Sequence, residues 1–145
     1  MDLTKAKIVT VGLCPCWDTT CFVDGIDWTE HKKISTKTSV PAGKAFNVSR
    51  CLAWMGLENT TAGLWGDKDY DAMSRAAASL SGLLKISFTR IDGKTRENIT
   101  LVDTANKRDM HLRAASELTT APAIAQLAND LEKILDEKDV CVFAG

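Results

Sequence analysis

The sequence predicts an α/β protein with a mostly parallel sheet, flanked by helices, that carries a small β-structured flap. Short apolar and β-branched runs, typical of buried strands, alternate with helical segments. Two polar stretches with partial period-2 alternation, at residues 17–40 and 95–114, interrupt that order and predict the flap. The 145 residues, 45% hydrophobic and 26% charged, suffice for one compact domain.

The strands fall into two groups. The predicted core strands, apolar and β-branched, are residues 7–13, 59–66, 83–91 and 139–145. The predicted flap strands, with one solvated face, are residues 17–23, 32–40, 95–103 and 107–114. Because only Thr104-Ala105-Asn106 separates the last two, they predict an antiparallel hairpin.

The first predicted helix covers residues 44–56. Val48, Leu52 and Met55 share one side of it, which predicts the buried face. Gly56 stands where a C-terminal glycine cap belongs, so the helix is expected to end there.

Two further helices are predicted at residues 69–80 and 122–137. Asp67 or Asp69 can cap the start of the former, and Thr120 that of the latter. A stripe of apolar side chains predicts the buried face of the last helix: Ile124, Leu127, Leu131, Ile134 and Leu135.

Composition argues against several classes of protein. The net charge is −1 and there is no run of Lys or Arg, so neither nucleic acid nor an anionic membrane is a favoured partner. The apolar segment at residues 8–13 is too short and too broken for a signal peptide or a membrane span. Five cysteines, an odd number without a secretory signal, indicate reduced thiols and a cytoplasmic location.

Cys14-Pro15-Cys16 has a C-x-C spacing that could suggest a metal or redox site. There is no second cysteine pair, and His31 and His111 are isolated in the sequence. We therefore interpret these residues as small buried thiols and expect no metal site.

Residues 41–50 (PAGKAFNVSR) form a small-residue loop that turns directly into a helix. Backbone N–H groups and Lys44 could approach an anion or a polyhydroxyl ligand there, near the positive end of the helix. The loop is no Walker motif, because Thr38 and Ala45 replace its glycine and its Ser or Thr, and no G-x-G-x-x-G is present. Taken alone, the loop is equally consistent with a turn that binds nothing.

Three segments in order make the ligand-binding interpretation specific: Pro15-Cys16-Trp17-Asp18, residues 42–50 (AGKAFNVSR) and residues 93–100 (GKTRENIT). They resemble the PfkB family of sugar kinases, which has the ribokinase-like fold, and most closely its branch of 1-phosphofructokinases and tagatose-6-phosphate kinases. That branch typically has N-P-A-x-D after the first strand, G-G-K-G-x-N-V-A-R at the first core helix and T-R-x-N-I in the lid hairpin. The resemblance covers the whole chain but only the N-terminal half of the family domain. It implies that residues 1–145 are the N-terminal part of one sugar-kinase domain, truncated at mid-fold, with lid segments at about 17–40 and 95–114.

The resemblance implies six substrate-binding residues: Asp18, Gly43, Lys44, Asn47, Arg96 and Asn98. Asp18, Gly43 and Asn47 would contact sugar hydroxyls, and Arg96, assisted by Lys44, would hold the substrate phosphate. From the residues alone, Asp18 could instead cap a turn, and Arg96 could form a surface ion pair with Glu97. Asn98 shares a strand face with Arg96 and could equally be a structural residue of the hairpin.

The implied activity is that of an ATP-dependent carbohydrate kinase, a phosphotransferase. It would move the γ-phosphoryl group of ATP, with Mg²⁺, to a hydroxyl of a hexose phosphate such as fructose 1- or 6-phosphate or tagatose 6-phosphate. The family's catalytic aspartate lies beyond Gly145, so no catalytic residue is expected in this chain. ATP and Mg²⁺ are expected to bind mainly through the other half, and the 145-residue chain alone is expected to be inactive.

Two other functions remain open. A kinase for an unphosphorylated sugar or nucleoside would share the fold, although Thr95-Arg96-Glu97-Asn98 and Gly43-Lys44 argue against it. A non-catalytic module that binds a sugar phosphate, and that forms a homodimer through the solvated flap strands, belongs to a different class.

The sequence departs from the family pattern at four positions. Cys14 replaces the usual Asn, Trp17 adds bulk beside Asp18, and Ala42 and Ala45 replace two glycines. Alanine resists a positive φ angle, so the loop is expected to differ locally if either position needs one.

Overall fold

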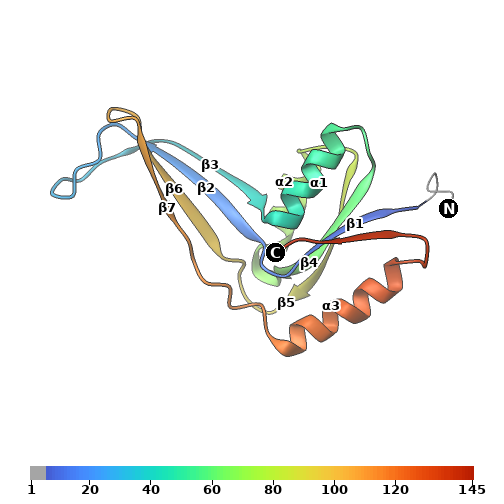
Figure 1. The fold of residues 1–145 in the computed structure, drawn as a ribbon. Helices are drawn as coiled ribbons and strands as arrows, with labels where there is room; N and C mark the ends of the chain where they lie inside the picture. Colours follow the sequence, from blue (N-terminus) through green and yellow to red (C-terminus); the bar gives the residue numbers. More distant parts are fainter. Residues whose placement is uncertain (1–5) are drawn as a thin grey trace.

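The computed structural model describes residues 6–145, which form two four-stranded sheets (Figure 1). The core sheet is parallel throughout, in the order β5-β4-β1-β8. Its strands are β1 (Ile8–Gly12), β4 (Asn59–Gly66), β5 (Leu84–Ile91) and β8 (Val140–Phe143). The predicted parallel sheet is therefore present.

The second sheet is the flap, in the order β3-β2-β6-β7, and Figure 1 shows it projecting away from the helices. Its strands are β2 (Cys16–Val23), β3 (Ile34–Ala42), β6 (Glu97–Asp103) and β7 (Arg108–Leu112). The β6–β7 pair is the predicted antiparallel hairpin. The two halves of the flap are joined by parallel pairing of β2 with β6, in which Asp18 lies opposite Asn98.

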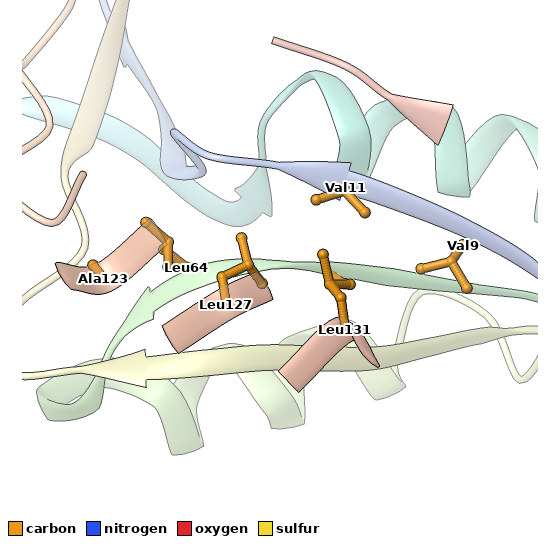
Figure 2. Close-up of a cluster of buried hydrophobic side chains, with 7 residues drawn as sticks. Val9, Val11, Leu64, Ala123, Leu127 and Leu131 are labelled. Atoms are coloured by element: carbon orange, nitrogen blue, oxygen red, sulfur yellow. The ribbon is translucent and has the colours of Figure 1, made fainter. Parts of the chain in front are cut away.

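Helices cover both faces of the core sheet: α1 (Lys44–Trp54), α2 (Tyr70–Ala78), which follows a 3-10 turn η2 (Asp67–Asp69), and α3 (Ala121–Ile134). Figure 2 shows the face covered by α3, where apolar side chains of β1 and β4 meet those of the helix. This cluster consists of Val9, Val11, Ala62, Leu64, Ala123, Leu127 and Leu131.

The opposite face, under α1 and α2, is built around aromatic rings. Trp65 of β4 is fully buried and packs edge-on against Phe88 of β5, with ring centroids 5.4 Å apart. Phe46 of α1 stacks on Phe88 at 5.9 Å, and Trp17 of β2 meets Trp65 edge-on at 5.7 Å. Because Trp17 belongs to the flap, this aromatic chain links the base of the flap to the core.

The predicted buried face of α1 is wrong. Val48 and Leu52 are only half-buried and Met55 is 73% exposed. The buried residues are instead Ala45, Phe46, Ser49 and Ala53. Ser49 is tolerated in the core because its hydroxyl hydrogen bonds to that of Thr10, with the oxygens 2.7 Å apart. The predicted C-terminal glycine is present, since Gly56 follows the C-cap residue Met55 with a φ of 81°.

The predicted features of α2 and α3 are only partly present. Thr120 caps α3, because its Oγ1 accepts a hydrogen bond from Ala123 N at 3.3 Å. Ile124 is 39% exposed, so it is not part of the buried stripe. Asp69 occupies the N-cap position of α2, but its side chain makes no capping bond.

The Asp69 carboxylate instead ties the flap to the core. It accepts hydrogen bonds from the Thr95 backbone N–H at 3.0 Å and from Trp17 Nε1 at 2.5 Å. Thr95 and Trp17 lie where the chain enters β6 and β2. The charge-assisted bonds therefore fix the starts of both central flap strands.

A buried carboxylate organises the far end of the flap. Asp103, at the end of β6, has no exposed surface and accepts five hydrogen bonds. The donors are Gly25 N, Ile26 N, Asn106 N, Asn106 Nδ2 and Arg108 Nε, at 2.8–3.2 Å. The side-chain bond from Asn106, and then those from Ile26 and Arg108, hold the pKa of Asp103 well below its usual range despite its burial.

This low pKa predicts an acid-sensitive flap. A carboxyl group whose folded pKa is depressed stabilises the fold above its unfolded pKa of about 3.9, and loses that contribution as the pH falls below it. We expect Asp103→Asn to be less stable than the wild type at pH 7, with the difference shrinking below about pH 4. Urea unfolding of both proteins at several pH values measures this difference. A difference independent of pH would contradict the assignment.

Candidate functional site

All six predicted substrate-binding residues line one cavity of about 500 Å³. The cavity lies between the flap and the core sheet, where β1 ends and α1 begins. Residues from the flap, the 41–50 loop and α1 meet there although they are far apart in the sequence. The geometry thus supports the grouping inferred from the motifs.

Gly43 brings bare backbone to the wall of this cavity. It has a φ of 130°, and a Cβ atom there would lie 3.1 Å from Pro15 Cα, so only glycine fits without strain. Among residues 6–145 no side chain caps the N-terminus of α1, which leaves N–H groups of its first turn available to a ligand. Ala42 lies in β3 and Ala45 in α1, and neither has a positive φ, so neither alanine is strained in this loop.

Asp18 is exposed and is held through only one of its carboxylate oxygens. Cys16 Sγ and Asn98 Nδ2 each donate to Asp18 Oδ1 at 3.3 Å. Within residues 6–145, Oδ2 makes no hydrogen bond. Asp18 is therefore oriented by its neighbours and keeps an acceptor for a ligand hydroxyl.

The Cys16 thiol is buried directly beside this carboxylate. Burial, followed by the negative charge of Asp18, raises the pKa of Cys16 to about 12, and the positive charges of Arg96 and Arg113 oppose this. The thiol is thus protonated at neutral pH and acts as a donor to Asp18. Cys14, in contrast, is exposed and lines the cavity, so its interpretation as a buried thiol is wrong.

Lys44 and Asn47 reach the cavity from α1. Both side chains are exposed, as expected for residues that meet a ligand. Lys44 Nζ donates to the Gly145 carbonyl oxygen at 2.5 Å, and the Asn47 side chain makes no hydrogen bond to another described residue. The Asn47 amide therefore has both donor and acceptor capacity for sugar hydroxyls.

Arg96 lines the cavity, yet much of its hydrogen-bonding capacity is already used. Its guanidinium donates to three backbone carbonyls: Cys14 O at 2.9 Å, Ala114 O at 3.0 Å and Pro15 O at 3.3 Å. The alternative of an ion pair with Glu97 is not observed in the described chain, where Glu97 pairs with Lys37 at 3.8 Å. Arg96 therefore braces the start of β2 against the segment after β7.

Comparison with known proteins identifies the family. The model of the pfkB family carbohydrate kinases matches residues 5–145. The chain belongs to this family. The PfkB chain is 32% identical over 99 residues to the 1-phosphofructokinase of Haemophilus influenzae, a match that covers 68% of the chain and 31% of the relative. It is 27% identical over 143 residues to the 1-phosphofructokinase of Vibrio cholerae. This match covers 99% of the chain and 44% of the relative.

Solved structures show that this PfkB chain has a ribokinase-like fold. A possible 1-phosphofructokinase from Thermotoga maritima matches with a TM-score of 0.82 and 25% identity, over 96% of this chain and 44% of that one. Phosphofructokinase-2 from Escherichia coli, in complex with fructose-6-phosphate, matches with a TM-score of 0.85 and 17% identity. This match covers 97% of this chain and 45% of that one. The PfkB chain thus spans less than half the length of these relatives.

Two basic side chains of the cavity were missed in the sequence analysis. His111 of β7 and Arg113, just beyond it, both line the PfkB cavity. His111 is held by Thr100, whose Oγ1 lies 3.0 Å from Nδ1, and by Asp109, whose carboxylate lies 3.2 Å from Nε2. The sequence signal that could have revealed them is the period-2 spacing of the predicted strand 107–114, which places residues 111 and 113 on the same face.

Within residues 6–145, no three His, Cys, Asp or Glu side chains are grouped so that they could hold a metal ion. The helices of the same residues are too short or too polar to cross a bilayer.

Proposed function

We propose that the protein carrying this chain transfers the γ-phosphoryl group of ATP to a hydroxyl of a hexose phosphate. Fructose 1-phosphate, fructose 6-phosphate and tagatose 6-phosphate are the acceptors we favour. The similarity to enzymes named 1-phosphofructokinase supports a phosphorylated sugar. In this proposal, residues 1–145 are the N-terminal part of one kinase domain and supply the sugar site, and the flap is its lid.

One observation carries the proposal. The oriented carboxylate of Asp18 lies in the same cavity as the uncapped start of α1 and the cations Lys44 and Arg96. Carboxylate and amide groups match the hydroxyls of a sugar, and cations with backbone N–H groups match a phosphate. A binding site that combines both suits a molecule that carries hydroxyls and a phosphate.

The residues of this chain would act by positioning the substrate. Asp18, Asn47, Asn98 and the backbone at Gly43 would fix the sugar ring, which sets the orientation of the accepting hydroxyl. The flap forms one wall of the cavity and would shield the bound sugar from water, limiting the hydrolysis of ATP.

The chemical step would need groups from outside the described residues. We propose that ATP and Mg²⁺ bind mainly through a part of the protein that corresponds to the segment of the longer relatives beyond their match with this chain. The same part would supply the aspartate that accepts the hydroxyl proton.

An acceptor panel tests the proposal. The protein at its natural length is incubated with ATP and each of fructose 1-phosphate, fructose 6-phosphate, tagatose 6-phosphate, fructose and adenosine, and ADP formation is followed. We expect turnover with a hexose phosphate well above that with fructose or adenosine. Turnover with only an unphosphorylated acceptor would favour a sugar or nucleoside kinase.

The same experiment separates the kinase from a non-catalytic module. Binding of hexose phosphates without ADP formation, together with a dimer in sedimentation analysis, would favour a sugar-phosphate-binding module that pairs through the flap. Turnover by residues 1–145 alone would contradict the location proposed for the catalytic groups.

A further inference from the structure

Among the cationic side chains that line the cavity, Arg113 makes the fewest hydrogen bonds and ion pairs to other described residues. It is exposed and lines the cavity just after β7. Within residues 6–145, its guanidinium makes no hydrogen bond and no ion pair. All five of its N–H donors therefore remain available to a ligand.

The backbone next to Arg113 is held on both sides by residues of β6 or just before it. Asn98 Oδ1 accepts a hydrogen bond from Ala114 N at 3.3 Å. Arg96 Nη1 donates to Ala114 O at 3.0 Å. The donor and the acceptor of Ala114 are thus both engaged, which limits where the preceding side chain can lie.

Asn98 connects this fixed backbone to the sugar-binding carboxylate. Its Nδ2 donates to Asp18 Oδ1 at 3.3 Å, while its Oδ1 receives the Ala114 N–H. The backbone next to Arg113 is therefore coupled to Asp18 through a single side chain.

Arg96 is less suited to be the main anion contact. Three of its five N–H groups donate to backbone carbonyl oxygens, which leaves fewer donors for a phosphate than Arg113 has. The Arg113 guanidinium donates to no oxygen of the described residues, so it can bind a phosphate through two parallel N–H groups.

The charged side chains that line the cavity favour an anionic ligand. Three cationic side chains, Lys44, Arg96 and Arg113, face the single carboxylate of Asp18 among the lining residues. The cavity is therefore electropositive even if His111 is neutral, and an anionic ligand would be attracted to it.

We propose that Arg113 is the main phosphate-binding side chain of the sugar site, and that Arg96 and Asn98 are positioning residues that hold the Ala114 backbone so that Arg113 faces the cavity. This inference rests on the proposed function, because it assumes that a hexose phosphate binds there. In this inference, Arg113 is the residue that makes the site prefer a phosphorylated sugar over an unphosphorylated one.

Binding measurements on four single variants test the inference. The variants are Arg113→Gln, Arg113→Lys, Arg96→Gln and the control Arg75→Gln, an exposed arginine of α2 outside the cavity. Isothermal titration of each protein, at its natural length, with fructose 1-phosphate, fructose 6-phosphate and fructose gives three affinities. Because Arg113 is exposed and its side chain makes no hydrogen bond or ion pair within residues 6–145, its substitution should leave the melting temperature unchanged.

The expected result is a loss of phosphate selectivity. Arg113→Gln should weaken binding of the preferred hexose phosphate roughly 10- to 100-fold and leave fructose binding unchanged. Arg113→Lys should recover part of the loss, because it restores the charge without the planar pair of donors. Arg75→Gln should match the wild type.

A double variant tests the positioning role of Arg96. If Arg96 acts through Arg113, Arg96→Gln lowers the ratio of hexose phosphate to fructose affinity in the wild type but not in the Arg113→Gln protein. An equal drop in that ratio in both proteins would show that Arg96 binds the phosphate itself and would overturn the positioning role.

The failures of the two proposals differ. If the wild type binds a hexose phosphate more tightly than fructose and Arg113→Gln does not change this, the inference is overturned and the proposed function stands. If the wild type prefers fructose or binds no hexose phosphate, both are overturned.

Discussion

Asp18→Asn is expected to lower kcat/KM for the preferred hexose phosphate by about 100- to 1000-fold. A carboxylate that accepts hydrogen bonds from two sugar hydroxyls contributes about 1.5–2 kcal/mol through each of them. The amide would also bring N–H donors toward Cys16 Sγ and Asn98 Nδ2, which themselves donate to residue 18. Steady-state ADP formation with ATP and the hexose phosphate measures the loss.

A matched control is Asp92→Asn. The Asp92 side chain is 94% exposed, lies outside the cavity and makes only a long ion pair with Lys68 at 4.0 Å. Its replacement should leave kcat/KM and the melting temperature unchanged. If Asp18→Asn retained wild-type activity as the control does, Asp18 would not be a sugar contact.

The parts of the site that could be predicted are those encoded by local motifs. Asp18 lies near the start of β2, Gly43 precedes α1 and Asn47 lies one turn into that helix, and the structure brings all three to one cavity. Of residues 41–50, Gly43 alone has a positive φ, so Ala42 and Ala45 are accommodated without backbone strain. Such features depend on a few consecutive residues, so a single sequence can reveal them.

The contacts that the sequence did not predict join distant residues. The parallel pairing of β2 with β6 places Asn98 beside Asp18 and brings Arg96 to the carbonyl of Cys14. Periodicity indicates which face of a strand a residue occupies but not which strand lies beside it. The engagement of Arg96 by backbone carbonyls, and the availability of Arg113, were therefore invisible in the sequence.

The wrong face of α1 has a different cause. Hydrophobic periodicity favours apolar residues such as Met55 over Ser49 for the core. Ser49 is buried because Thr10 of the neighbouring strand satisfies its hydroxyl, and Met55 is left exposed. Pairs of buried hydroxyls between a strand and a helix mislead any prediction based on hydrophobicity alone.

Gly63→Ala is expected to destabilise the fold by more than about 4 kcal/mol, enough to prevent folding of many domains. Gly63 of β4 pairs with Gly12 of β1 and has a φ of 153°, a conformation that residues with side chains rarely adopt. A Cβ atom there would lie 2.1 Å from the Gly12 carbonyl oxygen, so the two central strands would have to separate. Gly12 also lines the cavity, and a Cβ atom at Gly12 would lie only 2.9 Å from Ala45 Cβ of α1.

Gly82→Ala adds the same methyl group at a position where it meets no atom within 4 Å and where φ is not positive. This variant should be neutral or more stable by up to about 1 kcal/mol, because alanine lowers the entropy of the unfolded chain. Urea unfolding followed by far-ultraviolet circular dichroism compares the two variants with the wild type. Wild-type stability of Gly63→Ala would mean that β1 and β4 do not approach so closely. Because Gly12 of β1 also lies against Ala45 of α1 and lines the cavity, the arrangement of the proposed sugar site would then need revision.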